Sequence, residues 1–403
     1  MKNISEEYFK KYQDLSIKDL VNLDNRTLNT LMLEIYQRRS KKIQCYDTLQ
    51  KYIDNYEFYC PSKMDLRVIN KYNETFIDCL PEKYEAIELS PIVPFGANSS
   101  FTNLSQKNIL TTIKNSEVCS DATTALTLEA CKRRKSLYNK PEFINEEVNL
   151  ATIKKVLRMQ RFDKEKGYLQ HFGQFAILTA GRKNIDFEYD KLKEHIELWV
   201  NVLLKLKAQD FSLGKLNVGL CHINIIEHFI KNNFIEREII TKNSFNDFDL
   251  FNELGINIPS KISEYSDLSE NKIKVYRLNL IKLYINYLSK IIIDLKDKYP
   301  DVNFYIEMDR KGGLGYYTGS CFHIYSEENG VFIPLCDGGV PDWNSKILRD
   351  NKETSVVSGI GSELILNLYK SKRRTKWKKL ELFLHLTMYL VIFQTEQRQE
   401  LKI

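Results

Sequence analysis

The sequence predicts an α+β protein whose sheet is mainly antiparallel. Two segments with alternating apolar and polar residues, 320–325 and 330–336, are separated by the polar turn 326–329, which is the pattern of a hairpin. Two longer segments, 189–207 and 272–298, place apolar residues at helical intervals. Strands that meet at turns, with helices between them, favour an antiparallel sheet flanked by helices.

The segment 1–62 is predicted to form a helical extension. Its leucines and isoleucines recur at roughly helical intervals, and the Asp-Asn pair at 24–25 interrupts the pattern. A Pro-Ser pair at 61–62 marks the boundary, because proline breaks regular structure. We expect the main core over 63–370 and a basic, then apolar, helical tail over 371–403.

Short apolar runs alternate with turn residues in the first part of this core. A strand is predicted over 216–220 and a helix over 224–233. The segment 235–270 is then expected to be an insertion, because much of it is rich in Asn, Asp, Ser and Glu, and it reads as a linker or as weakly packed. Further on, 303–309 alternates as a strand, and the glycine-containing 358–361 leads into a helical pattern.

The composition excludes several classes of protein. Among 403 residues, 59 are basic and 53 acidic, and a net charge of +6 is too small to indicate nucleic-acid binding. The 43% hydrophobic and 28% charged content is that of a globular chain, whose length suggests two or three structural units. The eight cysteines include no CxxC pair, so neither a disulfide scaffold nor a zinc ribbon is expected.

No targeting or membrane segment is predicted. The N-terminus carries acidic and aromatic residues and lacks the apolar region of a signal peptide. The most apolar stretch, 380–393, is shorter than the roughly 18–20 residues that cross a bilayer. We therefore expect a cytoplasmic protein with no membrane contact.

Common motifs for nucleotide, metal and hydrolase sites are missing from the sequence. His222 and His228 do not have the spacing of a zinc-binding helix, and satisfied or exposed histidines are the simpler interpretation. The glycines of 312–315 do not fit GxGxxG, and neither GxxxxGK[ST] nor GxSxG occurs. A structural metal, an ordinary nucleotide loop and a hydrolase triad are therefore not predicted.

A more specific signal is an ordered set of short segments. They are EVCSDAT at 117–123, VLRMQR at 156–161 followed by HFGQF at 171–175 and TAGR at 179–182, GLGYYTGSCF at 313–322, and DGG at 337–339 followed by SGIG at 358–361.

This order resembles the catalytic core of a class II aminoacyl-tRNA synthetase of the histidyl type. That family carries RPExT, FRxE, a Gln-Phe segment, RGLDYYTGxxFE, GGRYD and GxERL in the same order. The resemblance covers about residues 65–370, and YYTGxxF followed by a hairpin and a double glycine is its most specific part. It implies a six-stranded antiparallel sheet flanked by helices, a homodimer whose interface includes 82–98, and ATP with Mg²⁺ on the sheet.

The resemblance also implies roles for single residues. Arg158 matches the FRxE arginine, a catalytic residue whose guanidinium clamps phosphate oxygens. Asp121 and Thr123 match the acid and threonine that face the ammonium group of the amino acid, and Gln174 and Tyr317 match two further pocket positions. The implied ligand-binding residues are Asp121, Thr123, Gln160, Gln174, Tyr316, Tyr317, Thr318, Gly338, Gly339 and Gly361.

Departures from the family pattern are equally informative. Gly312 stands where the arginine of RGLDYYT should be, although Arg310 and Lys311 are close in sequence. Leu178 replaces the glutamate that pairs with the histidine ring, and Leu364 replaces the arginine of GxERL. GGRYD becomes GGVPD and loses its basic residue. Because an apolar side chain cannot accept a hydrogen bond from an imidazole, we expect histidine specificity to be lost or rebuilt.

No counterpart of the family's anticodon-binding domain is expected, since only about forty residues, 362–403, follow the last motif. The regulatory subunit of short-form ATP phosphoribosyltransferase shares this trait, an aspartate in its RPDxT motif and the lost arginine before YYTG. This chain differs from it in the N-terminal extension, in Val340-Pro341 and in the tail.

Three functions follow from the residues and the resemblance. The first is a catalytically degenerate paralogue that binds an amino-acid-like small molecule and regulates a partner enzyme. The second is an active ATP-dependent ligase that adenylates an amino acid other than histidine. The third is RNA binding through the basic residues from Lys370 to Lys379, for which a solvated helix face is the simpler interpretation.

Overall fold

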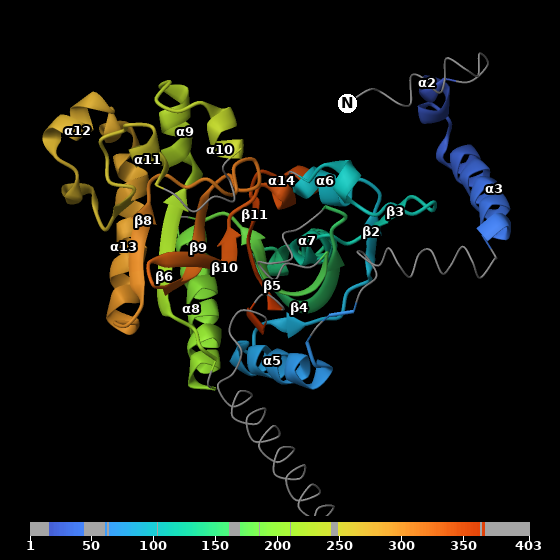
Figure 1. Ribbon diagram of the computed structural model, residues 1–403, viewed down its shortest axis with the longest axis horizontal. Helices are drawn as coiled ribbons and strands as arrows, with labels where there is room; N and C mark the ends of the chain where they lie inside the picture. Colours follow the sequence, from blue (N-terminus) through green and yellow to red (C-terminus); the bar gives the residue numbers. More distant parts are fainter. Residues whose placement is uncertain are drawn as a thin grey trace, which may run out of the picture.

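The computed structural model describes residues 16–43, 61–62, 64–102, 104–160, 170–184, 186–209, 211–242, 249–362 and 365–366. A large sheet with helices on both faces dominates this part of the chain (Figure 1). Six neighbouring strands of the sheet are antiparallel, which confirms the predicted α+β class. In spatial order they are β4 (Val148–Leu157), β5 (His171–Arg182), β11 (Glu353–Gly361), β10 (Val331–Gly339), β9 (Ser320–Glu328) and β6 (Lys215–His222).

Short strands extend both edges of these six. β1 (Glu85–Ala86) pairs in parallel with β4, and β8 (Asn303–Glu307) pairs in parallel with β6. β7 (Lys261–Ile262) then pairs antiparallel with β8. A separate pair is formed by β2 (Ile92–Pro94) and β3 (Ser116–Val118).

The hairpin between β9 and β10 is tighter than predicted. Its turn is Asn329-Gly330, with φ of 52° and 79°, and β9 continues to Glu328. Two consecutive left-handed residues are typical of a two-residue hairpin turn, and Asn-Gly is the sequence that favours it. The predicted turn 326–329 was therefore placed too early.

One face of the sheet is covered by α5 (Leu66–Cys79), α8 (Phe187–Ala208) and, beyond them, α13 (Lys282–Lys298). The ring of Phe76 in α5 stacks on Phe175 of β5 at 4.4 Å and on Trp199 of α8 at 5.4 Å between centroids. All three rings are fully buried, so this stack joins two helices and the sheet in one core. The helix predicted over 189–207 is confirmed; α5 was not predicted.

The other face is covered by α7 (Ala122–Leu137), which packs on β4 and β5. The sequence did not predict this helix, because buried residues lie on almost every side of its first two turns. The buried residues of the whole helix are mostly small, namely Ala122, Thr123, Thr124, Ala125, Leu126, Thr127, Ala130, Cys131 and Arg134. A helix of this kind shows no amphipathic period.

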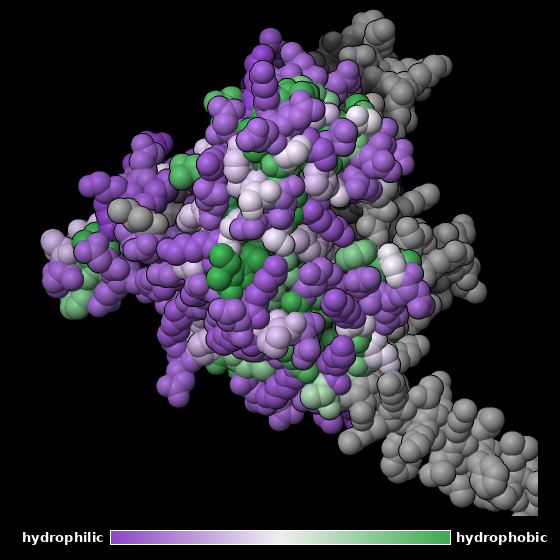
Figure 2. Space-filling view, turned by 90° about the vertical axis from the view of Figure 1, so that its left-hand side faces the viewer, coloured by the Kyte–Doolittle hydropathy of each residue, from purple (hydrophilic) through white to green (hydrophobic). Residues whose placement is uncertain are grey.

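The predicted single helix over 272–298 is broken. α12 (Glu270–Val275) ends at a left-handed Arg277, with φ of 55°, and a 3₁₀ turn over Leu278–Ile281 leads into α13. The change of direction allows Leu278 and Ile281 to be buried. Figure 2 shows this side of the molecule, which is mostly hydrophilic with scattered hydrophobic groups. The exposed apolar side chains of these elements are Val275, Leu280, Leu283 and Ile293.

The predicted insertion is better packed than expected. After α9 (Ile223–Lys231) it contains α10 (Arg237–Lys242), α11 (Leu250–Glu253) and a 3₁₀ turn at Tyr265–Asp267. Phe251 is fully buried, and its ring lies 4.8 Å from that of Phe229. The description of this segment as weakly packed is therefore wrong for its described residues.

The described part of 1–62 is helical. α2 (Ile17–Val21) and α3 (Asn25–Ile43) are separated at 22–24, as the interrupted pattern predicted. Asp24 accepts hydrogen bonds from the backbone of Arg26 and Thr27, so it caps α3. The tail 371–403 lies outside the described residues.

Shorter helices complete the described chain. They are α6 (Ala97–Phe101), α14 (Trp343–Leu348), and 3₁₀ turns at Gln106–Asn108 and Pro141–Phe143. Within the described ranges no helix has the length and apolar character to cross a membrane.

Candidate functional site

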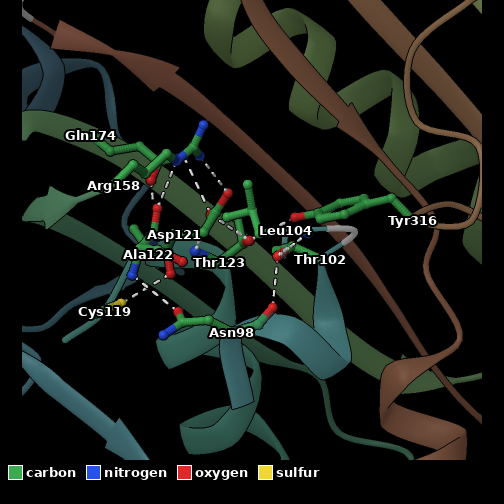
Figure 3. Close-up of polar contacts among 11 residues, drawn as sticks. Asn98, Thr102, Leu104, Cys119, Asp121, Ala122, Thr123, Arg158, Gln174 and Tyr316 are labelled. Carbon is green, nitrogen blue, oxygen red and sulfur yellow. Dashed lines mark hydrogen bonds and ion pairs between the residues drawn. The ribbon is translucent and has the colours of Figure 1, made fainter. Parts of the chain in front are cut away.

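Asp121 is the centre of a polar network at the first turn of α7 (Figure 3). Its Oδ1 accepts hydrogen bonds from the backbone nitrogen of Thr123 at 3.0 Å and from the hydroxyl of Thr123 at 2.7 Å. The residue precedes the first helical residue, where an aspartate satisfies otherwise unpaired N–H groups. Capping thus fixes one carboxylate oxygen and leaves Oδ2 for other partners.

Arg158 takes that second oxygen. It follows β4, and its Nη2 lies 3.3 Å from Asp121 Oδ2 while its Nε donates to the carbonyl of Ser120 at 3.0 Å. The guanidinium also lies over the ring of Phe172, 5.3 Å from the centroid. The Arg158 side chain is 24% exposed and that of Asp121 is 12% exposed, so both are reachable from solvent.

Gln174 of β5 closes the network from the sheet. Its Oε1 accepts from the backbone nitrogen of Ala122 at 2.9 Å, and its Nε2 lies 3.4 Å from Asp121 Oδ1. A Cβ added to Gly359 of β11 would lie 3.2 Å from this Nε2. The glycine therefore leaves room for the Gln174 side chain to lie across the strand.

Tyr316 joins the network from the 313–322 segment. Its hydroxyl lies 2.8 Å from the hydroxyl of Thr123. Burial, followed by the charge of Asp121, raises the pKa of Tyr316, so the phenol is neutral at physiological pH. Gly313 and Gly315, with φ of 85° and 79°, give the left-handed turns that bring this tyrosine back over the sheet.

A second layer supports the backbone of 119–121. The Asn98 side chain is fully buried, accepts from the backbone nitrogen of Ser120 at 3.0 Å and donates to Glu117 Oε1 at 2.9 Å. These supporting residues were not predicted, because their role depends on a contact between separate loops rather than on a motif.

The other motif residues lie less directly at the site. Tyr317 is 3% exposed and packs behind Tyr316, with ring centroids 4.7 Å apart. The backbone nitrogen of Thr318 donates to Val340 at 2.9 Å, and its side chain is exposed. Gln160 is half-buried just beyond Arg158, where the described part of that loop ends.

The three glycines differ in what they face. Gly361 pairs with Gln174 in the sheet and so lies on the site's face. A Cβ at Gly338 would meet Phe322 and Ser358 at 2.5 Å, and Ser358 hydrogen-bonds to His195 of α8 on the opposite face. Gly338 is therefore a packing glycine rather than a ligand contact. Gly339 is needed for close packing too, since its Cβ would lie 2.5 Å from that of Cys321.

The positions that depart from the family pattern are also placed by the structure. Leu178 is fully buried on the α7 side of β5, between Leu150 and Val357 of the neighbouring strands, so it belongs to the core. Leu364 lies outside the described residues.

Arg310 does not reach toward Arg158 as a substitute clamp. Its side chain is fully buried, its Nε donates to the carbonyl of Gly312 at 2.9 Å, and its Nη2 lies 2.7 Å from Asp337 Oδ1. The adjacent Lys311 is half-buried. Arg310 is thus held in an internal ion pair, a placement that the sequence did not predict.

Beneath Arg310 lies a second carboxylate. Glu307 accepts a hydrogen bond from the hydroxyl of Tyr325 at 3.0 Å, and its Oε2 lies 3.7 Å from His323 Nδ1. Burial alone would raise the pKa of Glu307, but the contacts with His323 and the charge of Arg310 outweigh it and lower the pKa to about 2. Glu307 is therefore ionised at neutral pH.

A surface groove of about 390 Å³ lies elsewhere, between α13 and the 3₁₀ turn at Tyr265–Asp267. None of its lining residues is a candidate residue. Over the ranges that the structure describes, no three His, Cys, Asp or Glu side chains gather as metal ligands would.

The fold is that of the class II aminoacyl-tRNA synthetase core. Similar solved structures include an ATP phosphoribosyltransferase regulatory subunit/histidyl-tRNA synthetase from Bacillus halodurans, at a TM-score of 0.55 and 16% identity over 78% of this chain and 84% of that one. The histidyl-tRNA synthetase of Nostoc gives 0.56 and 14%, over 77% and 73% of the two chains. A histidine–tRNA ligase subunit from Alicyclobacillus acidocaldarius gives 0.53 and 13%, over 76% and 95%.

No family model and no curated protein matches the sequence. The resemblance noted in the motifs is therefore supported by structure at low identity, and it defines the fold.

Proposed function

We propose that the protein binds an amino-acid-like small molecule at the Asp121 network and regulates a partner enzyme, without efficient adenylate formation. The observation that carries the proposal is Asp121 itself, a partly exposed carboxylate oriented by Thr123, Gln174 and Arg158. A carboxylate oriented in this way accepts hydrogen bonds from an ammonium group. An amino acid would thus be held by its α-ammonium.

The proposed weakness in adenylation rests on the arginines. Arg158 already donates to Ser120 and Asp121, Gly312 offers no side chain, and Arg310 is buried in its pair with Asp337. When an amino-acid carboxylate attacks the α-phosphate of ATP, charge develops on the phosphate oxygens. Stabilising that charge needs hydrogen-bond donors that point at those oxygens. The role in regulation is proposed by analogy with the Bacillus halodurans protein, whose description includes a regulatory subunit.

The second candidate is an active ligase for an amino acid other than histidine. It is favoured by the 24% exposure of Arg158, whose guanidinium could turn from Asp121 to a phosphate oxygen of ATP with Mg²⁺. In this case the ammonium of the bound amino acid would replace Arg158 as the partner of Asp121.

Two measurements on the full chain separate these functions. Isothermal titration calorimetry with each of the common amino acids tests binding, and amino-acid-dependent ATP–pyrophosphate exchange tests adenylation. The proposal expects binding that is weakened by D121N, with no exchange above background. Exchange that is lost in R158A would establish the ligase instead, and absence of any binding would contradict both.

A further inference from the structure

Asp337 lies on the same face of the sheet as the Asp121 network. In the sheet register Asp337 is opposite Gly359, and Gly359 is opposite Ala176, two residues from Gln174 on β5. Side chains two residues apart on a strand share a face, and directly paired residues share it too. The Cβ position of Gly359 points at Gln174 Nε2, which places Gly359 and Gln174 on this same face.

No side chain from β11 stands between the two carboxylates. Gly359 and Gly361 supply the site-facing positions of that strand, opposite Ala176 and Gln174. Strands β5 and β10 are two strand spacings apart, roughly 10 Å. Tyr316 lies near both carboxylates, since the charges of Asp121 and Asp337 both raise the pKa of its phenol.

Asp337 is held in place on one side only. Its Oδ1 is 2.7 Å from Arg310 Nη2 and 3.4 Å from His323 Nε2, and its side chain is 45% exposed. The structure gives its Oδ2 no partner among the described residues. A carboxylate that is fixed through one oxygen and exposed at the other is preorganised to accept a hydrogen bond.

Two carboxylates lie beside the guanidinium of Arg310. Arg310 is 2.7 Å from Asp337 and 4.0 Å from the buried Glu307, so one guanidinium serves two carboxylates. Lys311 acts on a further carboxylate, Asp309. Of the two carboxylates Asp337 is the accessible one, with its side chain 45% exposed against 13% for Glu307.

We infer that Asp337 is a specificity-determining residue, which binds a positively charged side-chain end of the amino-acid ligand. The inference rests on the proposed function, because Asp121 must hold the α-ammonium. The ligand then lies over the glycines of β11, with one cation at each carboxylate. Lysine, ornithine and arginine have this chemistry, and lysine separates its two ammonium groups by a chain of five carbons.

Isothermal titration of the full chain with L-lysine and L-norleucine tests the inference without any mutation. Norleucine keeps the α-amino acid and the alkyl chain but lacks the terminal ammonium. A charge-assisted hydrogen bond is worth enough to make lysine bind about 10- to 100-fold more tightly. L-ornithine and L-arginine are measured in parallel, and at least one of the three cationic amino acids should show this preference.

The outcomes distinguish the inference from the proposed function. If norleucine or another neutral amino acid binds as tightly as all three cationic ones, Asp337 has no such role and the proposed function stands. If no amino acid binds, the proposed function fails as well.

A variant assigns the effect to the residue. D337N keeps an oxygen for Arg310 and should remove most of the lysine preference while leaving norleucine binding unchanged. The control is D294N, because Asp294 of α13 pairs with Lys193 of α8 at 3.0 Å and both helices cover the other face of the sheet. An unchanged lysine preference in D337N, with a circular dichroism spectrum like that of the wild type, overturns the inference.

Discussion

Arg134 of α7 and Glu353 of β11 form a fully buried ion pair with two parallel contacts. The Nε and Nη2 atoms of Arg134 each lie 2.8 Å from a different carboxylate oxygen, and both side chains are completely shielded from solvent. The pair connects the helix that begins beside Asp121 to the strand that carries Gly359. The ion pair therefore fixes the position of the Asp121 network relative to strand β11, whose glycines Gly359 and Gly361 lie on the same face.

Breaking this pair should be costly. We expect E353Q to lower the free energy of unfolding by about 3–5 kcal/mol, because Arg134 would remain charged in the interior. Denaturant unfolding followed by circular dichroism measures the change. E85Q is the matched control, since Glu85 pairs with Arg133 but its side chain is 59% exposed, and a change below about 1 kcal/mol is expected there. Equal losses would contradict the assigned importance of burial.

A substitution at Leu178 tests whether the glutamate that pairs with the histidine ring in the family can be restored in this protein. We expect L178E to destabilise the protein by about 3 kcal/mol or more, because the new carboxylate would lie in the core without a partner. L178M conserves volume and should change stability by less than about 1.5 kcal/mol. Thermal and denaturant unfolding measure both. A stable L178E protein with histidine-dependent pyrophosphate exchange would mean that position 178 opens onto the site.

Asp309 predicts a pH dependence of stability. Its carboxyl is buried and accepts from the backbone nitrogen of Leu250 at 2.9 Å, and burial together with the charge of Glu307 raises its pKa to about 7. Because the folded state holds this proton more tightly than the unfolded state, the stabilisation is complete below about pH 4 and is lost as the pH rises to about 7. Lys311 and Asp249 are the other charged groups that act on it.

Unfolding free energies at pH 5 and pH 7 check this sign. Relative to D309N, the wild type should lose about 2–3 kcal/mol between the two values, at up to about 1.4 kcal/mol per pH unit. The comparison removes other titrating groups that both proteins share. Parallel pH profiles for the two proteins would show that Asp309 does not change its protonation over this range.

We expect a homodimer whose interface includes the region 82–98, and exposed apolar side chains in and near this region could form the contact between the two subunits. Around β2 and β3 the apolar side chains of Ile92, Phe95 and Leu110 are 44%, 59% and 40% exposed. We expect F95E to shift the mass measured by light scattering at micromolar concentration from dimer to monomer. L283E, on the exposed side of α13, is the control and should leave the mass unchanged. A monomeric wild type would remove the expectation.

The regular parts of the fold could be predicted because their patterns are local. The apolar residues of α8 recur at a helical interval, and those of β6 alternate with Asn217 and Gly219, so both elements could be recognised from the sequence alone, although β6 is buried on both faces. α7 could not be predicted, since its first turns are buried on almost every side. The break at Arg277 could not be predicted because it depends on the tertiary contacts that bury Leu278 and Ile281.

The residues of the candidate site likewise fall into those that local motifs predict and those whose position depends on contacts between distant segments. Asp121, Arg158, Gln174 and Tyr316 were identified from the order of the motifs, and the structure brings these four together. The position of Asp337 required the pairing of β10 with β11, which no motif contains. The burial of Arg310 likewise depends on neighbours far away in the sequence.

The register of β11 has a consequence for insertions and deletions in this chain. Gly359 and Gly361 lie on the face of the sheet that carries the candidate site. Ser358 lies on the opposite face, where its hydroxyl hydrogen-bonds to His195 and Trp199. Removing one residue from the middle of this strand would exchange its two faces. A hydroxyl would then occupy the floor of the site, and the buried imidazole would lose its partner. Insertions and deletions of one residue within β11 should therefore be excluded, even where the side chains on either side are kept.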